Sequence, residues 1–187
     1  MEEPRQAKEE LLWLNTDASY RLESSDLYVL GLRPFAHAIA QEIAQYPEDI
    51  EKRRVVVFDS VDDMKANPTD VAVDMICFVL SMKSKLSFER VQEILNGIQK
   101  EEQQYFLLNR WALVILDVAD PGKFTFELAD VRKFADSLNL PIIYGHDSSD
   151  TKVLKIVAGR VCRLLSRAAR GRGVSPMLDI SAFPPQL

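Results

Sequence analysis

Residues 26–31 read Asp26-Leu27-Tyr28-Val29-Leu30-Gly31, an apolar run that ends in a glycine, and a stretch with helical spacing follows from Pro34 to Tyr46. This order predicts a strand, a tight turn and a helix. In nucleotide-binding α/β proteins such a turn reads G-x-x-x-x-G-K-[ST], and its amides and lysine bind phosphates. Here it reads Gly31-Leu32-Arg33-Pro34-Phe35-Ala36-His37-Ala38. The second glycine and the Lys-Ser or Lys-Thr pair are missing, and Pro34 has no amide hydrogen. We therefore predict that this strand, turn and helix form without a phosphate-binding site.

The rest of the chain alternates between strand and helix patterns. Further strands are predicted at Arg54–Phe58, Val73–Leu80, Arg110–Val118 and Pro141–Tyr144, which are rich in apolar and β-branched residues. Further helices are predicted from a cap at Ser87, from about Phe126 to Ser137, and from a cap at Ser149 or Asp150 to about Ala169. The run Val73–Leu80 is nearly all apolar, as in a central strand buried on both faces. We therefore predict an α/β fold with a mostly parallel sheet and helices on both faces.

Composition is that of one ordinary globular domain, since 47% of the 187 residues are hydrophobic and 27% are charged. We expect a polar or irregular segment over residues 1–25, a folded domain over 26–172 and an irregular tail over 173–187. The two cysteines, Cys77 and Cys162, are flanked by apolar residues and lie far apart in the sequence. This pattern predicts buried thiols in a protein of a reducing compartment. No signal peptide and no apolar run of about 20 residues is recognisable, so we expect an intracellular, soluble protein without a membrane partner.

The predicted last helix carries an uneven charge. Seven basic and no acidic residues lie between Thr151 and Arg172, although the net charge of the whole chain is −5. Its apolar stripe predicts packing on the sheet, and its outward side is predicted to present Lys152, Lys155, Arg160, Arg163, Arg167 and Arg170. A solvated face, an acidic protein partner and a phosphate backbone are all compatible with this pattern, in that order of preference. No aromatic residues are interleaved, which argues against stacking on single strands.

The ends of the other predicted strands are where ligands of open α/β sheets bind. Leu80–Lys85 offers two lysines and two hydroxyls but no glycine, which favours a solvated loop over an anion site. A GTPase would have Asn-Lys-x-Asp where this chain has Asp117-Val118-Ala119-Asp120. Asp120 could read a guanine, but the asparagine and the lysine are missing. Gly145-His146-Asp147-Ser148 likewise lacks a Ser-Ala-Lys turn.

The remaining histidines and aspartates do not form a recognisable catalytic or phospho-acceptor motif. His146 and Asp147 beside Tyr144 suggest acid–base work, but no serine or cysteine nucleophile is recognisably paired with them, so a solvated turn is preferred. His37 is interpreted as a helix residue. Asp59, Asp62 and Asp63, with Lys123, resemble the acidic pocket of a phospho-acceptor domain, yet that pocket belongs after the first strand. We therefore nominate no catalytic, cofactor-binding or metal-binding residue, and expect no cofactor and no small-molecule substrate.

Two stretches indicate a family. The run from Val73 to Ser87 resembles the central strand and following turn of the centromere protein M family, and Gly173–Leu178 resembles the ending of that family. Leu14-Asn15-Thr16, Leu30-Gly31 and Leu140–Tyr144 add to the resemblance, which extends in the same order from about residue 14 to 180.

The resemblance implies a Ras-like (small GTPase) fold that has lost nucleotide binding and hydrolysis. It also implies a non-enzymatic scaffold subunit of the constitutive inner-kinetochore network in the nucleus, needed in cell division. There it would assemble with centromere proteins H, I and K and dock on the helical-repeat protein centromere protein I.

Candidate partner-binding surfaces are the loop Met82–Leu86, the helix after it, the last helix and the tail Gly173–Phe183, whose apolar residues could equally pack within the protein. The candidate residues on these surfaces are Met82, Lys83, Lys85, Leu86, Arg163, Arg167, Val174, Met177 and Leu178. The main alternative is a divergent nucleotide-binding enzyme with a phosphate site around Gly31-Leu32-Arg33 and Lys83. A third hypothesis is a subunit that contacts DNA through the basic helix, with binding that weakens steeply with salt.

Overall fold

The computed structural model of the protein describes residues 24–47, 52–60, 73–97 and 110–170. Within these ranges the elements follow one another as β1 (Ser24–Gly31), α1 (Arg33–Gln45), β2 (Lys52–Phe58), β3 (Met75–Ser81), α3 (Lys85–Gly97), β4 (Trp111–Leu116), the 3-10 helix η2 (Pro121–Lys123), α5 (Leu128–Ser137), β5 (Ile142–Tyr144) and α6 (Thr151–Arg170). The division into a domain over 26–172 and two flanking segments stays a prediction, because residues 1–23 and 171–187 lie outside the described ranges.

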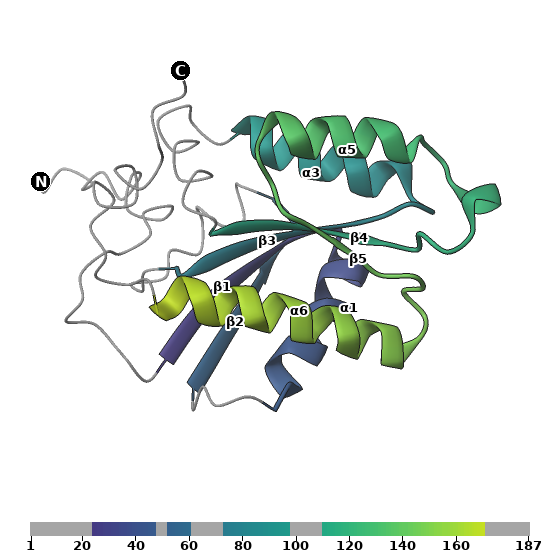
Figure 1. Ribbon diagram of the computed structural model, residues 1–187. Coiled ribbons are helices and arrows are strands. Elements are labelled where there is room, and N and C mark those ends of the chain that lie inside the picture. The colour runs from purple at the N-terminus through teal and green to yellow at the C-terminus, as the bar shows by residue number, and fades with distance from the viewer. Residues whose placement is uncertain (1–23, 48–51, 61–72, 98–109, 171–187) are drawn as a thin grey trace, which may run out of the picture.

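The strands form one five-stranded sheet with the order β2-β1-β3-β4-β5, and every described pairing is parallel. The order reverses beside β1, since β2 lies on one side of it and β3 on the other. Of the described helices, α3 and α5 cover one face of the sheet and α1 and α6 cover the other (Figure 1). This confirms the predicted α/β class and is consistent with a Ras-like fold.

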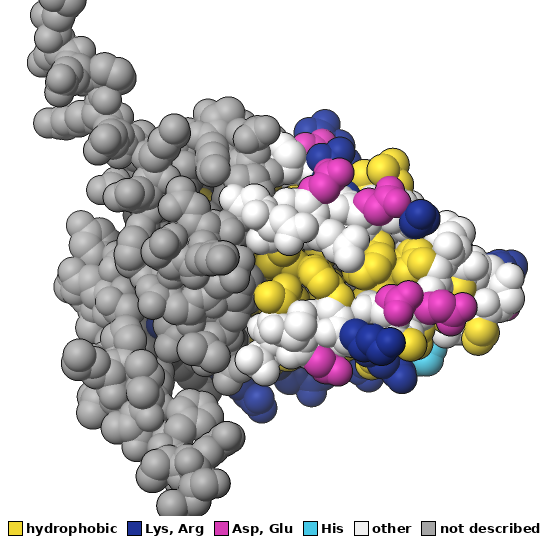
Figure 2. All heavy atoms as spheres, turned by 90° about the horizontal axis from the view of Figure 1, so that it is seen from above, with side chains coloured by type: hydrophobic (Ala, Val, Ile, Leu, Met, Phe, Trp, Pro, Cys, Tyr) yellow, Lys and Arg dark blue, Asp and Glu magenta, His cyan; other side chains and the backbone are white. Residues whose placement is uncertain are grey.

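Strand β3 lies at the centre of both cores. Its side chains alternate: Ile76, Phe78 and Leu80 belong to the core on the side of α3 and α5. Cys77 and Val79 belong to the core on the side of α1 and α6. All seven residues of β3 are buried, which confirms the prediction of a central strand covered on both faces. Phe78 also stacks on Trp111 of β4 with 5.3 Å between ring centroids. The apolar side chains between α3 and α5 are visible from that side in Figure 2.

The start of α3 differs from the prediction. The expected cap was Ser87, but the helix begins at Lys85, and the Ser84 hydroxyl oxygen accepts the Ser87 amide hydrogen at 3.3 Å. Ser84 therefore takes the capping position. The Ser87 side chain is buried instead, and its oxygen accepts the Ser81 amide hydrogen at 2.9 Å. This hydrogen bond joins the end of β3 to the first turn of α3.

The other predicted helices occur near their expected bounds. Asp150 caps α6, because its carboxylate accepts the Lys152 amide hydrogen at 2.8 Å. The predicted stripe of α6 packs inward, with Leu154, Val157, Val161 and Leu165 buried. Both cysteines are buried, as predicted, and neither is part of a disulfide. In the described part of the chain, no helix has both the length and the apolar character that crossing a membrane requires.

Candidate functional site

The junction between β1 and α1 is the place where a nucleotide-binding relative would hold phosphates. Gly31 has a φ of +152°, and a Cβ added there would lie 2.3 Å from the carbonyl oxygen of Val79. The glycine is therefore required by the close approach of β3. At the first turn of α1, the amides of Phe35 and Ala36 both donate to the carbonyl oxygen of Leu32, each at 3.0 Å. Since Pro34 has no amide hydrogen, this turn differs from a phosphate-binding loop in its chemistry as well as its sequence.

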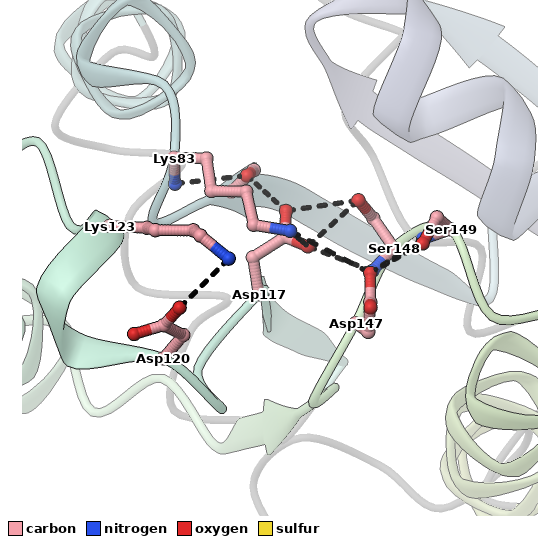
Figure 3. A network of polar contacts seen from close by, with 8 residues as sticks. Lys83, Asp117, Asp120, Lys123, Asp147, Ser148 and Ser149 are labelled. Carbon is pink, nitrogen blue, oxygen red and sulfur yellow. Dashed lines mark hydrogen bonds and ion pairs between the residues drawn. The ribbon is translucent and has the colours of Figure 1, made fainter.

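The described polar residues at the carboxyl edge of the sheet gather around Asp117, directly after β4 (Figure 3). Asp117 has a φ of 63°, a left-handed conformation that aspartate tolerates better than most residues, and its side chain is fully buried. Its carboxylate accepts a hydrogen bond from the Ser81 hydroxyl at the end of β3. It also accepts the amide and hydroxyl hydrogens of Ser148, at 2.8 and 2.9 Å, from the turn that follows β5.

Lys83 supplies the positive charge of this cluster. Its ammonium lies 3.0 Å from one Asp117 oxygen and 3.7 Å from Asp147, and its own amide donates to the Ser81 hydroxyl oxygen at 3.2 Å. The hydrogen bond to Asp117 is the main reason why the pKa of Lys83 lies above its ordinary value. A lysine in this state is protonated at neutral pH, so it can act as neither a general base nor a nucleophile.

The charge of Asp117 is held by the same contacts. Burial is the largest single influence and pushes the pKa of Asp117 upward, but the hydrogen bonds from Ser81, Ser148 and Lys83 together outweigh it. The pKa of Asp117 is therefore lowered, and its carboxylate is ionised at neutral pH. Because the acceptor sites of Asp117 are filled by protein donors, we interpret this cluster as an internal brace that joins β3, β4 and β5.

Asp120, which could have read a guanine, lies in a different contact. Its carboxylate is 2.9 Å from the Lys123 ammonium and accepts the Gly122 amide hydrogen at 3.2 Å, so it caps η2. The pKa of Asp120 is lowered, chiefly by the hydrogen bond from Lys123. Lys123, nominated for a phospho-acceptor pocket, is thus paired with Asp120. Asp59 lies 3.9 Å from Arg33, whereas Asp62 and Asp63 fall outside the described residues.

The two histidines and the adjacent tyrosine form no catalytic arrangement in the described residues. His37 and His146 are both exposed. The Tyr144 hydroxyl accepts a hydrogen bond from Arg132 at 3.1 Å, and the same guanidinium lies 5.7 Å from the centre of the tyrosine ring. Within the described ranges, no group of three histidine, cysteine, aspartate or glutamate side chains is placed to hold a metal ion.

The predicted partner-binding residues are divided by the structure. Met82 is fully buried in the core, so its side chain packs internally and offers no surface. Lys85 and Leu86 are exposed at the start of α3, where Lys85 lies 3.4 Å from Glu89. Arg163 and Arg167 are exposed on α6. The tail residues Val174, Met177 and Leu178 lie outside the described residues, so their nomination rests on the sequence alone.

Sequence reasoning missed Asp117, Ser81 and Ser148 as a group. A usable signal was present, because each lies at or just beyond the end of a predicted strand, and the carboxyl ends of parallel strands meet at one edge. Lys83 was nominated, but as a free cation for a phosphate or a partner rather than as the partner of Asp117.

Comparison with known proteins gives one positive result. A family model described as Centromere protein M matches residues 63–183, which is more than half of the chain and covers β3 to α6. A search of curated proteins finds no match to the chain.

Proposed function

Because the chain belongs to the centromere protein M family of kinetochore components, we propose that it is a non-catalytic scaffold subunit of the inner kinetochore. In this proposal it acts in the nucleus, at centromeres, in chromosome segregation. It assembles with centromere proteins H, I and K, and it docks on centromere protein I. Membership of the family supports a role at the centromere.

The observation that carries the non-catalytic part is the pairing of Lys83 with Asp117 at 3.0 Å. Lys83 is the lysine that a divergent phosphate site would use, and Arg33 of the same hypothetical site lies 3.9 Å from Asp59. Binding a phosphate there would require Lys83 to leave a buried carboxylate without its charge partner, which is unfavourable. The Lys83–Asp117 pair and Pro34 in the first turn of α1 therefore support a domain that binds protein partners through its surface and binds no nucleotide.

The mechanism that we propose is burial of surface against a partner. A folded α/β domain offers a preformed face, so little conformational entropy is lost on binding. A partner that binds only the folded state also stabilises that state by mass action. Lys85, Leu86, Arg163 and Arg167 are the candidate contacts on described elements. Val174, Met177 and Leu178 are proposed as contacts from the sequence.

The direct test is co-expression with centromere protein I from the same organism, followed by size-exclusion chromatography without added nucleotide. A stable stoichiometric complex is expected, and separate elution at micromolar concentration would overturn the proposal. Leu86→Asp and Met177→Asp are expected to weaken co-elution. Ala129→Asp, at an exposed position of α5, is the matched control and should leave it unchanged.

Nucleotide binding tests the enzyme alternative. Titration with a fluorescent GTP analogue and magnesium is expected to give no saturable signal in the micromolar range. If micromolar binding were found, and if Lys83→Met abolished it, the chain would be a nucleotide-binding protein and the non-catalytic assignment would be wrong.

A further inference from the structure

Helix α6 presents an exposed stripe that its packing against the sheet does not use. The stripe consists of Lys152, Ile156, Arg160, Arg163 and Arg167, and we call it the basic stripe. All five side chains are exposed, and Ile156 is 57% exposed although it is a large apolar residue. Besides Ile156, only Leu86 is a comparably exposed large hydrophobic residue in the described part of the chain.

Helical geometry makes the basic stripe straight. At 3.6 residues per turn, offsets of 4, 8, 11 and 15 residues from Lys152 fall within an arc of about 80°, and Ile156 lies near its centre. The rise of 1.5 Å per residue makes the stripe about 22 Å long between Lys152 and Arg167. Intervals of three and four residues are also the repeat that a second helix presents when it packs alongside.

The charge of the basic stripe is not balanced within the described residues. Among them, no carboxylate lies within ion-pair distance of these four cations. Arg160 and Arg163 instead donate to the backbone carbonyl oxygens of Tyr144 and Gly159, at 3.4 and 3.3 Å.

Helix α3 shows the contrast. On α3 basic side chains are paired with acidic ones of the same helix: Lys85 lies 3.4 Å from Glu89, and Arg90 lies 3.2 Å from Glu93. In such pairs the charges of the helix are balanced by neighbours on the same helix. Among the residues that the structure describes, the basic stripe has no such pairing, and an acidic partner would supply it.

We propose that the basic stripe binds an acidic amphipathic helix of a protein partner, whose carboxylates pair with the four cations and whose apolar side chain covers Ile156. Charge complementarity identifies the acidic partner. Ile156 favours a protein helix over a phosphate backbone, since a phosphate backbone has no apolar group to place against it. The inference deepens the proposed function, on which it rests, by assigning a chemistry to one docking surface of the subunit.

The experiment measures the binding of a fluorescein-labelled acidic helix by anisotropy, with the full chain as the receptor. The probe is a peptide of about 20 residues, long enough to be helical, with glutamates at intervals of three and four beside a leucine stripe. A scrambled peptide of the same composition and a duplex DNA of similar length are measured in parallel.

The expected result is saturable binding of the ordered peptide, weakened about tenfold or more by Arg163→Glu, a substitution at a close charge pair. Ile156→Ser is expected to weaken binding about fivefold through the lost apolar contact. Lys133→Glu changes the net charge equally but lies on α5, on the opposite face of the sheet, and should leave binding unchanged. Circular dichroism verifies that each variant is folded.

Any one of four results would overturn the inference. Equal effects of Arg163→Glu and Lys133→Glu, or equal binding of the scrambled peptide, would mean unspecific charge attraction. DNA binding that depends on Arg163 but not on Ile156, and whose binding constant falls steeply as the salt concentration rises, would show that the stripe binds phosphates. Binding of neither probe would leave a solvated face.

Co-elution and peptide binding, measured on the wild-type chain, separate this inference from the proposed function. If the wild-type chain co-elutes with centromere protein I but the peptide does not bind, only the inference fails. If the wild-type chain does not co-elute with centromere protein I, the proposed function fails whatever the peptide does.

Discussion

The Lys83 ammonium lies 3.0 Å from the Asp117 carboxylate, which joins the loop after β3 to the end of β4. This edge of the sheet is where ligands of open α/β folds bind. In this chain the pair fills the edge with an internal contact, and Ser81 and Ser148 complete the coordination of the carboxylate. Groups in this position thus contribute to folding stability.

Replacing Asp117 is expected to destabilise the fold. Asp117→Ala removes a buried acceptor of several hydrogen bonds, and it also places alanine at a φ of 63°, so we expect a loss of about 3 kcal/mol in the free energy of unfolding. Asp117→Asn keeps the size and tolerates the backbone, and it should lose about half as much. Chemical denaturation measures both. Asp120→Asn is the exposed control and should have little effect. Equal stability of all three variants would contradict the role of Asp117.

The same pair predicts a dependence of stability on pH. Because the pKa of Asp117 is lowered in the folded state, its contribution is fully present above an unfolded-state value of about 4 and is lost as the pH falls through the folded value. The pKa of Lys83 is raised, so its contribution is fully present below about pH 10 and is lost at higher pH. The difference in unfolding free energy between wild type and Asp117→Asn should therefore be largest near neutral pH and shrink at both extremes. If the unfolding free energies of the two proteins changed with pH in parallel, the titration of Asp117 and Lys83 would not contribute to stability.

Gly31 is predicted to be intolerant of any side chain. In Gly31→Ala the new Cβ would meet the Val79 carbonyl oxygen at 2.3 Å, at a φ of +152° that side chains rarely adopt, and we expect a loss of about 3 kcal/mol or failure to fold. The matched control is Gly122→Ala, whose Cβ would lie 3.3 Å from the exposed Asp120 side chain. Thermal unfolding compares the two. A control as damaging as Gly31→Ala would refute the argument from close approach.

The two thiols are predicted to be unreactive in the folded protein. Cys77 and Cys162 are fully buried, and burial raises the pKa of Cys77 to about 12, so almost no thiolate forms at neutral pH. A disulfide reagent such as Ellman's should modify neither thiol under native conditions and both in denaturant. Rapid native modification of either cysteine would show that the corresponding core opens readily.

Much of the fold could be predicted because its signals are local. The apolar run of β3 and the helical spacing of α1, α5 and α6 are read from neighbouring residues, and the structure confirms these elements. The cap of α3 was misplaced, since Ser84 and Ser87 have the same chemistry and only the turn after β3 decides which hydroxyl meets an amide of the first turn. Met82 was nominated for the surface, yet it is buried between elements that are distant in the sequence.

By itself, the sequence determined the α/β class, the loss of the phosphate-binding motif and the basic character of α6, because each depends on residue types at short spacing. Only the tertiary structure decided that Asp117 meets Ser81 and Ser148, which lie 36 and 31 residues away. These side chains approach one another when β3, β4 and β5 pair in register, and no local pattern encodes that register. The structure likewise decided that Lys83 is held by a buried carboxylate, since pairing depends on distance in space rather than along the chain.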